Sequence, residues 1–203
     1  EPLENPVNKF IKRGFDVMFS LMVILFFYPI LFPVIAIIIK LTSKGPVFYK
    51  QLRAGKNYKK FYIWKFRTMR QENDNGFVQA VKDDSRVTKI GKFLRKTSLD
   101  EMPQFFNVLI GNMSVVGPRP HPIELDEEYK NMIDKYMVRN FVKPGITGMA
   151  QIKGFRGGTE TKWKMQKRVQ YDIWYIENWT FFLDLYIIIQ TILNAVKGDK
   201  NAY

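Results

Sequence analysis

The stretch from Val17 to Ile39 has no Asp, Glu, Lys or Arg, and it reads Val-Met-Phe-Ser-Leu-Met-Val-Ile-Leu-Phe-Phe-Tyr-Pro-Ile-Leu-Phe-Pro-Val-Ile-Ala-Ile-Ile-Ile. An apolar helix of about 20 residues is long enough to cross the hydrocarbon core of a bilayer. The stretch therefore predicts a helix embedded in a membrane, and a helix that spans the bilayer once is the simplest form of it.

Two features favour a helix that enters one leaflet and returns. Pro29 and Pro33 lie inside the run, where each removes a backbone hydrogen bond and bends the helix. Both flanks are basic, with Lys9, Lys12 and Arg13 before the run and Lys40 and Lys44 after it. Because basic flanks stay on the cytoplasmic side, both ends are expected on that side. We therefore predict a re-entrant helix-break-helix over residues 11–41.

The charge and composition limit the kinds of partner. A net charge of +13 over 203 residues indicates an anionic partner, which is nucleic acid, an acidic membrane surface or a phosphorylated small molecule. No zinc-finger spacing or RNA-binding signature is present, so nucleic acid is not expected. The chain has no cysteine and one histidine, His121, which is most simply a loop residue. Any bound metal is then a hard cation on oxygen ligands, such as Mg²⁺.

The rest of the chain is predicted to be an α/β domain, mostly helical with a small β-hairpin. The opening Glu-Pro-Leu-Glu-Asn-Pro has no initiator methionine, so residues 1–10 are read as a linker from a missing N-terminal region. Residues 42–203 are expected to form a membrane-associated domain on the cytoplasmic face. Val47–Leu52 and Lys60–Thr68 are predicted strands, joined by a turn that contains Ala-Gly-Lys-Asn.

Other elements follow from periodicity, charge order and turn residues. The expected elements are a loop over Gln71–Arg86, helices over Val87–Lys96, Pro122–Arg139 and Thr159–Tyr175, a turn over Lys143–Gly148 and a short strand over Met149–Ile152. A last helix over Trp179–Val196 carries an apolar stripe with an aromatic rim. That stripe is typical of a core face, and an interfacial membrane helix is the alternative.

Asp100 and Glu101 are the candidate catalytic residues. Asp100 is placed at a probable helix start, where unsatisfied N–H groups and the helix dipole would keep its carboxylate ionised. An ionised Asp can take a phosphoryl group covalently, so Asp100 is a candidate nucleophile. Glu101 would then bind the metal, position Asp100 or move a proton, and both carboxylates are candidate Mg²⁺ ligands. The alternative is structural, because Ser98 followed by Glu101 fits a capping box.

Basic residues nearby are candidate phosphate ligands. Arg119 lies between Pro118 and Pro120, whose fixed φ angles restrict its backbone and suit a bidentate grip on phosphate. Lys65 and Arg67 alternate along the second predicted strand and so share one face. The ordinary alternatives are a surface arginine in a proline-rich loop and a solvated polar face of a hairpin.

Several separated motifs, in order along nearly the whole chain, resemble the bacterial monotopic phosphoglycosyl transferases, which initiate polysaccharide or glycoconjugate assembly. The motifs are Lys12-Arg13-Gly14-Phe15-Asp16, Lys65-Phe66-Arg67-Thr68-Met69, Ser98-Leu99-Asp100-Glu101-Met102-Pro103-Gln104, Gly117-Pro118-Arg119-Pro120, Pro144-Gly145-Ile146-Thr147-Gly148 and Tyr171-Asp172. Tyr28 stands before Pro29 where smaller members often have serine, so local support for the helix break is expected to differ.

The resemblance implies a two-step, Mg²⁺-dependent reaction at the cytoplasmic face of the bacterial inner membrane. Asp100 would attack the β-phosphate of a UDP-sugar and release UMP, and the phosphosugar would then pass to undecaprenyl phosphate. Glu101 would be the second member of the family's Asp-Glu dyad, and Arg95, Arg119 and Arg156 would contact phosphates or the nucleotide. The end of the chain looks like the larger members, which transfer glucose 1-phosphate or galactose 1-phosphate.

Two other classes of function remain open at this stage. A membrane-tethered basic module could bind acidic partners without turnover, and a scaffold could use the two apolar helices to organise a bilayer. Strong salt-dependent DNA binding without release of UMP would favour the binding module. A substitution of Arg119 that leaves function intact would favour the scaffold. A homo-oligomer is compatible with every one of these readings.

Overall fold

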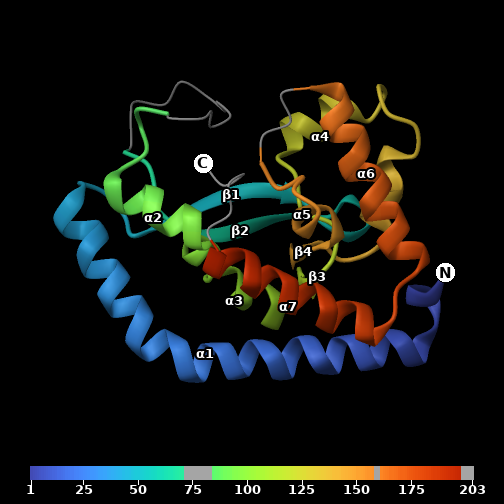
Figure 1. Cartoon of the computed structure of the whole chain (residues 1–203), viewed down its shortest axis with the longest axis horizontal. Coiled ribbons are helices and arrows are strands. Elements are labelled where there is room, and N and C mark those ends of the chain that lie inside the picture. The colour runs from blue at the N-terminus through green and yellow to red at the C-terminus, as the bar shows by residue number, and fades with distance from the viewer. Residues whose placement is uncertain (71–83, 158–160, 198–203) are drawn as a thin grey trace.

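One long helix, α1 (Pro6–Thr42), underlies the rest of the chain in the computed structural model, which describes residues 1–70, 84–157 and 161–197 (Figure 1). Asn5 begins α1, since its side chain accepts a hydrogen bond from the backbone N–H of Val7 at 2.8 Å. The expected break is not found, because the backbone stays helical through Pro29 and Pro33. Figure 1 instead shows α1 bending part-way along its length. A helix typically bends where proline removes a backbone hydrogen bond.

Buried polar contacts attach the first half of α1 to the domain. Nζ of Lys12 lies 2.6 Å from Oδ2 of Asp184 on α7 (Phe181–Lys197). Oδ1 of Asp16 accepts hydrogen bonds of 2.9 Å from the hydroxyl of Ser114 and from the backbone N–H of Val115. All of these charged groups are buried, so separating α1 from the domain would leave unpaired charges.

The predicted hairpin is confirmed. β1 (Phe48–Ala54) and β2 (Lys60–Phe66) are antiparallel, with Phe48 opposite Phe66 and Ala54 opposite Lys60. The turn between them contains the short 3₁₀ segment Lys56–Tyr58.

A second, parallel sheet was not predicted. It pairs β3 (Ser114–Val116) with β4 (Gly145–Thr147), and the expected strand over Met149–Ile152 is instead a short helix, α5. The two strands meet where a Cβ on Gly145 would lie 2.1 Å from the backbone nitrogen of Gly117. The glycine that suggested a turn therefore serves a close approach of two backbones.

The other helices follow the sequence pattern with one exception. They are α2 (Lys89–Thr97), α3 (Gln104–Leu109), α4 (Ile123–Tyr129), α6 (Lys162–Glu177) and α7, with 3₁₀ segments at Pro2–Glu4, Leu99–Glu101 and Tyr136–Phe141. The single helix predicted over Pro122–Arg139 is wrong, because α4 ends at Tyr129 and Lys135 adopts a left-handed φ of 59°. Most of the predicted 71–86 loop, and Thr159, lie outside the described residues.

The main core lies between α1, the sheets and the C-terminal helices. Val108 of α3, Val116 of β3, Ile176 of α6 and Ile187 of α7 are fully or almost fully buried within it. The prediction that α7 packs into the core is confirmed for one face only. Its opposite face is open, since Phe182 and Val196 on α7 are 79% and 82% exposed.

Candidate active site

Asp100 and Glu101 lie in a single 3₁₀ turn, Leu99–Glu101, between α2 and α3. Ser98 precedes this turn with a left-handed φ of 62° and makes no capping hydrogen bond with its side chain. Its hydroxyl instead accepts a hydrogen bond from Nη1 of Arg156. The capping-box interpretation is therefore wrong, and the side chain of Glu101 is available for other contacts.

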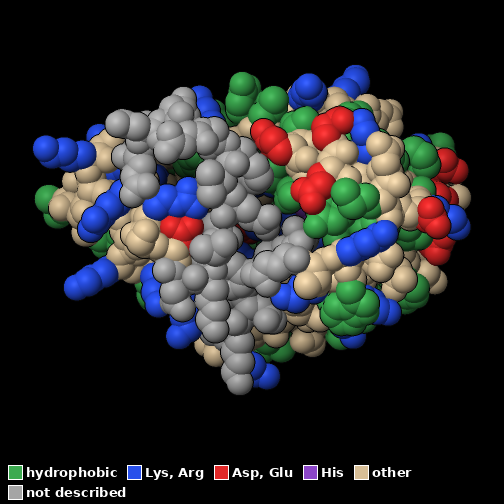
Figure 2. All heavy atoms as spheres, turned by 90° about the horizontal axis from the view of Figure 1, so that it is seen from above, with side chains coloured by type: hydrophobic (Ala, Val, Ile, Leu, Met, Phe, Trp, Pro, Cys, Tyr) green, Lys and Arg blue, Asp and Glu red, His purple; other side chains and the backbone are tan. Residues whose placement is uncertain are grey.

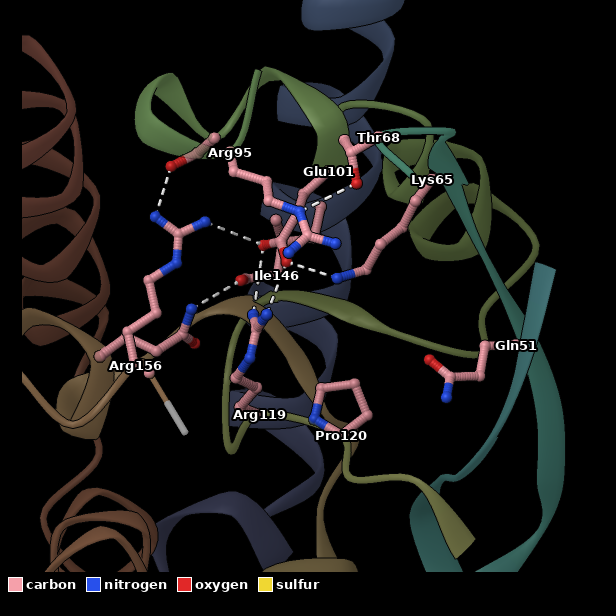
Figure 3. A network of polar contacts seen from close by, with 12 residues as sticks. Gln51, Lys65, Thr68, Arg95, Glu101, Arg119, Pro120, Ile146 and Arg156 are labelled. Atoms are coloured by element: carbon pink, nitrogen blue, oxygen red, sulfur yellow. Dashed lines mark hydrogen bonds and ion pairs between the residues drawn. The ribbon is translucent and has the colours of Figure 1, made fainter. Parts of the chain in front are cut away.

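Three cationic side chains converge on Glu101 (Figure 3). Its Oε1 lies 2.7 Å from Nζ of Lys65 and 2.6 Å from Nη2 of Arg119. Its Oε2 lies 3.2 Å from Nη1 of Arg119 and 3.5 Å from Nη2 of Arg156. The fork of Arg119 thus binds the carboxylate through both oxygens, a geometry that a guanidinium is suited to. These residues come from β2, the Pro118–Pro120 loop and the segment after α5.

The cations determine the charge of Glu101. Burial alone would favour its neutral form, but Arg119, Lys65 and Arg156 outweigh burial and hold the pKa of Glu101 well below its ordinary value. Glu101 is therefore a fixed anion at neutral pH. It holds three cations at one place that would otherwise repel one another.

Asp100 has a different environment, although it is the next residue. Its side chain is buried, and within residues 1–70, 84–157 and 161–197 no hydrogen-bond partner reaches Oδ1. Burial, followed by the charge of Glu101, raises the pKa of Asp100 above its ordinary value, against the opposing pull of Lys65, Arg156 and Arg95. This shift is opposite in direction to the one expected for a carboxylate at a helix N-terminus, and among the described residues no N–H group donates to Oδ1 of Asp100.

The structure brings four of the five predicted phosphate ligands to this site. Lys65, Arg119 and Arg156 contact Glu101. The positive charge of Arg95 opposes the rise in the pKa of Asp100, and Nε of Arg95 donates to Oγ1 of Thr68 at 2.9 Å. We name these residues, Lys65, Arg95, Arg119 and Arg156, the cation cluster.

Arg67 does not join the cation cluster. Its guanidinium binds the end of α1, where Nη1 donates to the carbonyl of Lys44 at 2.5 Å and Nη2 donates to the carbonyl of Ser43 at 2.8 Å. β2 ends at Phe66, so the alternation that placed Lys65 and Arg67 on one face does not continue. The contacts of Arg67 indicate a structural role at the α1 terminus.

The carboxylates fit a magnesium ion in part. The described residues contain no group of three or more Asp, Glu or His side chains that could hold a metal. Both oxygens of Glu101 contact cations, whereas Oδ1 of Asp100 has no hydrogen-bond partner among the described residues, so Asp100 is the carboxylate with an oxygen to offer. Mg²⁺ often takes one or two protein carboxylates and fills its other positions with substrate phosphates and water, so a fit through Asp100 is reasonable.

A second buried polar cluster next to the Pro118–Pro120 loop was missed. Arg139 and Asp172 form an ion pair of 2.9 Å, and Arg139 also binds the carbonyl of Arg119. The charge order of Pro122–Arg139 predicts only that Arg139 lies at the end of a helix, and Asp172 is identified only as part of the Tyr171-Asp172 motif. Pairing between residues 33 positions apart leaves no signal in spacing.

Comparison with known proteins shows the family to which the chain belongs. Residues 7–198 match the sequence profile of a family that is described as "Bacterial sugar transferase". The chain belongs to the bacterial sugar transferase family. The match extends from the start of α1 to the end of α7, so the family's domain includes both the long apolar helix and the Asp100–Glu101 turn.

Several relatives in this family carry a named activity. A UDP-glucose:undecaprenyl-phosphate glucose-1-phosphate transferase from Klebsiella pneumoniae is 52% identical over 98% of the chain, and one of the same name from Escherichia coli (strain K12) is 49% identical over 97%. A UDP-N-acetylgalactosamine-undecaprenyl-phosphate N-acetylgalactosaminephosphotransferase from Aeromonas hydrophila is 39% identical over 97%. The chain spans 43%, 42% and 46% of the length of these relatives.

Proposed function

We propose that this bacterial sugar transferase domain moves a hexose 1-phosphate from a UDP-sugar to undecaprenyl phosphate through a covalent intermediate on Asp100. A carboxylate oxygen of Asp100 attacks the β-phosphorus, the bond from that phosphorus to the bridging oxygen breaks, and UMP leaves with the electron pair. A phosphate oxygen of the acceptor lipid then attacks the same phosphorus. The acyl-phosphate bond breaks and Asp100 is again a carboxylate.

The observation that carries the proposal is the pair of carboxylates with opposite environments. Oδ1 of Asp100 has no hydrogen-bond partner within the part of the chain that the structure describes, whereas Glu101 is neutralised by Lys65, Arg119 and Arg156. Phosphoryl transfer depends on positioning and on neutralising charge around the phosphorus. The cation cluster supplies that neutralisation next to an oxygen that is free to attack.

Glu101 is assigned the role of holding Lys65, Arg119 and Arg156 in place before substrate binds. A bound diphosphate would compete with Glu101 for Arg119 and Arg156, so these side chains can pass from one anion to another with little movement. Asp100 would hold Mg²⁺, which would neutralise further negative charge on the diphosphate. Arg95, beside Asp100, is assigned to phosphate or nucleotide binding.

The names of the relatives support glucose as the sugar. The two relatives near 50% identity are named for UDP-glucose, and the relative named for N-acetylgalactosamine is more distant at 39%. We therefore place glucose 1-phosphate first, with galactose 1-phosphate as the next choice.

A monotopic position at the cytoplasmic face of the inner membrane is part of the proposal. Within the described chain α1 is the helix long and apolar enough to cross a membrane by length and composition, and only 22% of its most apolar window is buried. Exposed apolar side chains lie on α3 and α7 as well as on α1, as Phe26, Phe106 and Ile192 illustrate. On the face opposite α1, charged side chains of both signs are scattered over the surface (Figure 2).

The re-entrant course is supported by the bend of α1 and by its two basic ends. Lys12 and Asp16 fix the first half of α1 to the domain through buried contacts, which a helix crossing alone to the far side of a bilayer would lack. The lipid acceptor would then meet Asp100 at the membrane surface while its chain stays in hydrocarbon.

Mass spectrometry on the full-length protein in detergent tests the mechanism. Incubation with UDP-glucose and Mg²⁺ without acceptor should give one UMP per protein and a hexose-phosphate adduct on Asp100, and undecaprenyl phosphate should discharge it. Asp100→Asn should give neither product. Full activity of Asp100→Asn, or release of UMP without an adduct, would refute the covalent route, and salt-dependent binding of acidic partners without UMP would favour the binding module.

A further inference from the structure

Three successive backbone carbonyls of the Pro118-Arg119-Pro120 loop are each held by a different part of the fold. The carbonyl of Pro118 accepts from the backbone N–H of Gly145 on β4 at 2.9 Å. The carbonyl of Arg119 accepts from Nη2 of Arg139 at 2.5 Å. The carbonyl of Pro120 accepts from Nη1 of Arg53 on β1 at 3.2 Å.

This arrangement is needed because the loop has few means of holding itself. Pro118 and Pro120 have no backbone N–H, so the loop cannot form the paired bonds of a strand or a helix turn. Carbonyls that are buried without a partner would be costly. The two arginines, Arg53 and Arg139, therefore fix the loop from which the side chain of Arg119 reaches Glu101.

Arg139 is itself fixed on two sides. Its Nε and Nη2 lie 3.1 Å and 2.9 Å from Oδ2 of Asp172, and Arg139 and Asp172 are 3% and 1% exposed. Its Nη1 faces Nδ1 of His121, which also lies 2.7 Å from the hydroxyl of Tyr136. Nη2 carries two hydrogens, so one can be donated to Asp172 and the other to the carbonyl of Arg119.

We propose that Arg139 is a positioning residue, held by Asp172 and assisted by Arg53. It fixes the backbone of Arg119 at the distance from which the guanidinium of Arg119 can contact its anion. The inference rests on the proposed function, because it assigns these buried residues to the same reaction. Arg139 acts only through the backbone of Arg119. The anion is Glu101 in the structure described here and the diphosphate of the UDP-sugar during the reaction.

A double-mutant cycle on the full-length enzyme tests this relation. Arg139→Lys keeps the charge, but a single ammonium lacks the flat fork that binds Asp172 and the carbonyl together. We expect it to lower kcat/KM for UMP release from UDP-glucose by about tenfold, a typical coupling for contacting residues. In an Arg119→Ala background the same change should cost less than about twofold, because the side chain that it positions is gone.

Arg13→Lys is the matched control. Arg13 also binds two successive carbonyls, those of Val108 and Leu109 at 2.6 Å and 2.8 Å, but at the end of α3. Its effect on kcat/KM should be the same with and without Arg119. If Arg139→Lys does not fold, Asp172→Asn replaces it, since the amide keeps the shape of the carboxylate and should show the same dependence on Arg119 with a smaller loss.

The outcomes separate the two proposals. The proposed function would be overturned if the wild-type enzyme forms no adduct with UDP-glucose, UDP-galactose or UDP-N-acetylgalactosamine. The positioning role alone would be overturned if the wild-type enzyme forms the adduct but Arg139→Lys does not lower kcat/KM. The same conclusion would follow if Arg139→Lys lowers kcat/KM equally with Arg119 and with Arg119→Ala.

Discussion

Replacing Glu101 by glutamine should destabilise the protein, because it removes the carboxylate charge that contacts Lys65, Arg119 and Arg156 together. Breaking a buried ion pair by neutralising one partner costs about 3–5 kcal/mol. The three cationic side chains keep 16%, 19% and 14% of their surface accessible, so water compensates part of the loss. We therefore take about 3 kcal/mol, the low end of that range.

For a domain of this size, about 3 kcal/mol corresponds to a fall in Tm of about 6–12 °C. Thermal unfolding of the full-length protein in detergent near pH 7 measures it, with Asp100→Asn as the control at the adjacent position. Because burial and Glu101 raise the pKa of Asp100, its charged form is unfavourable in the fold, and Asp100→Asn should keep or raise the Tm. The same Tm for wild type and Glu101→Gln would refute the argument that the cations depend on Glu101.

Three further predictions concern pH and the bend of α1. Because the pKa of Asp100 is raised, the rate of adduct formation should increase with pH through a value above the ordinary Asp pKa of about 3.9, and an acid limb at or below that value in a pH-rate profile would contradict this. Burial, then Arg139 and Arg168, hold the pKa of His121 well below its ordinary value, so the unfolded chain binds the proton first as pH falls below about 6.5. The free energy of unfolding of the wild type, relative to that of His121→Gln, should therefore fall by about 1.4 kcal/mol between pH 7.5 and 5.5, as chemical denaturation would measure. If the difference between the two proteins does not change with pH, His121 is not shielded from protons. Tyr28→Phe removes the hydrogen bond from the Tyr28 hydroxyl to the carbonyl of Met102 and should cost about 1 kcal/mol with the apolar contacts retained, which thermal unfolding against Tyr62→Phe, an exposed tyrosine on β2, would measure.

The elements that the sequence predicted are those whose signal is local. The hairpin and helices α2 and α7 follow from alternation, from a turn and from helical spacing, and all three are confirmed. The parallel sheet could not be predicted in this way, because β3 and β4 are three residues each and meet through Gly117 and Gly145. The end of α4 was missed because the acidic-to-basic charge order continues to Arg139 although the helix does not.

The site shows the same division between local and distant information. Spacing identified Asp100, Glu101 and Arg119, while the resemblance to a family supplied Arg95 and Arg156. Neither could tell that Glu101 holds the cations and that Asp100 keeps a free oxygen, since this depends on which side chain the fold turns toward Lys65 and Arg119. The prediction that Arg67 is a phosphate ligand was wrong for the same reason, because its guanidinium binds the end of α1 and does not reach the site.

One hydrogen bond links the long apolar helix α1 to the residue that follows the Asp100–Glu101 pair. The hydroxyl of Tyr28, at the residue before Pro29, donates to the carbonyl of Met102, which directly follows Glu101. Pro29 and Pro33 allow α1 to bend, and the Tyr28 bond attaches that region to the turn that carries both carboxylates. Under the proposed function, a helix lying in the bilayer would thereby be held within a few residues of Asp100, so the depth of α1 in the membrane would also set the height at which Asp100 meets a lipid phosphate.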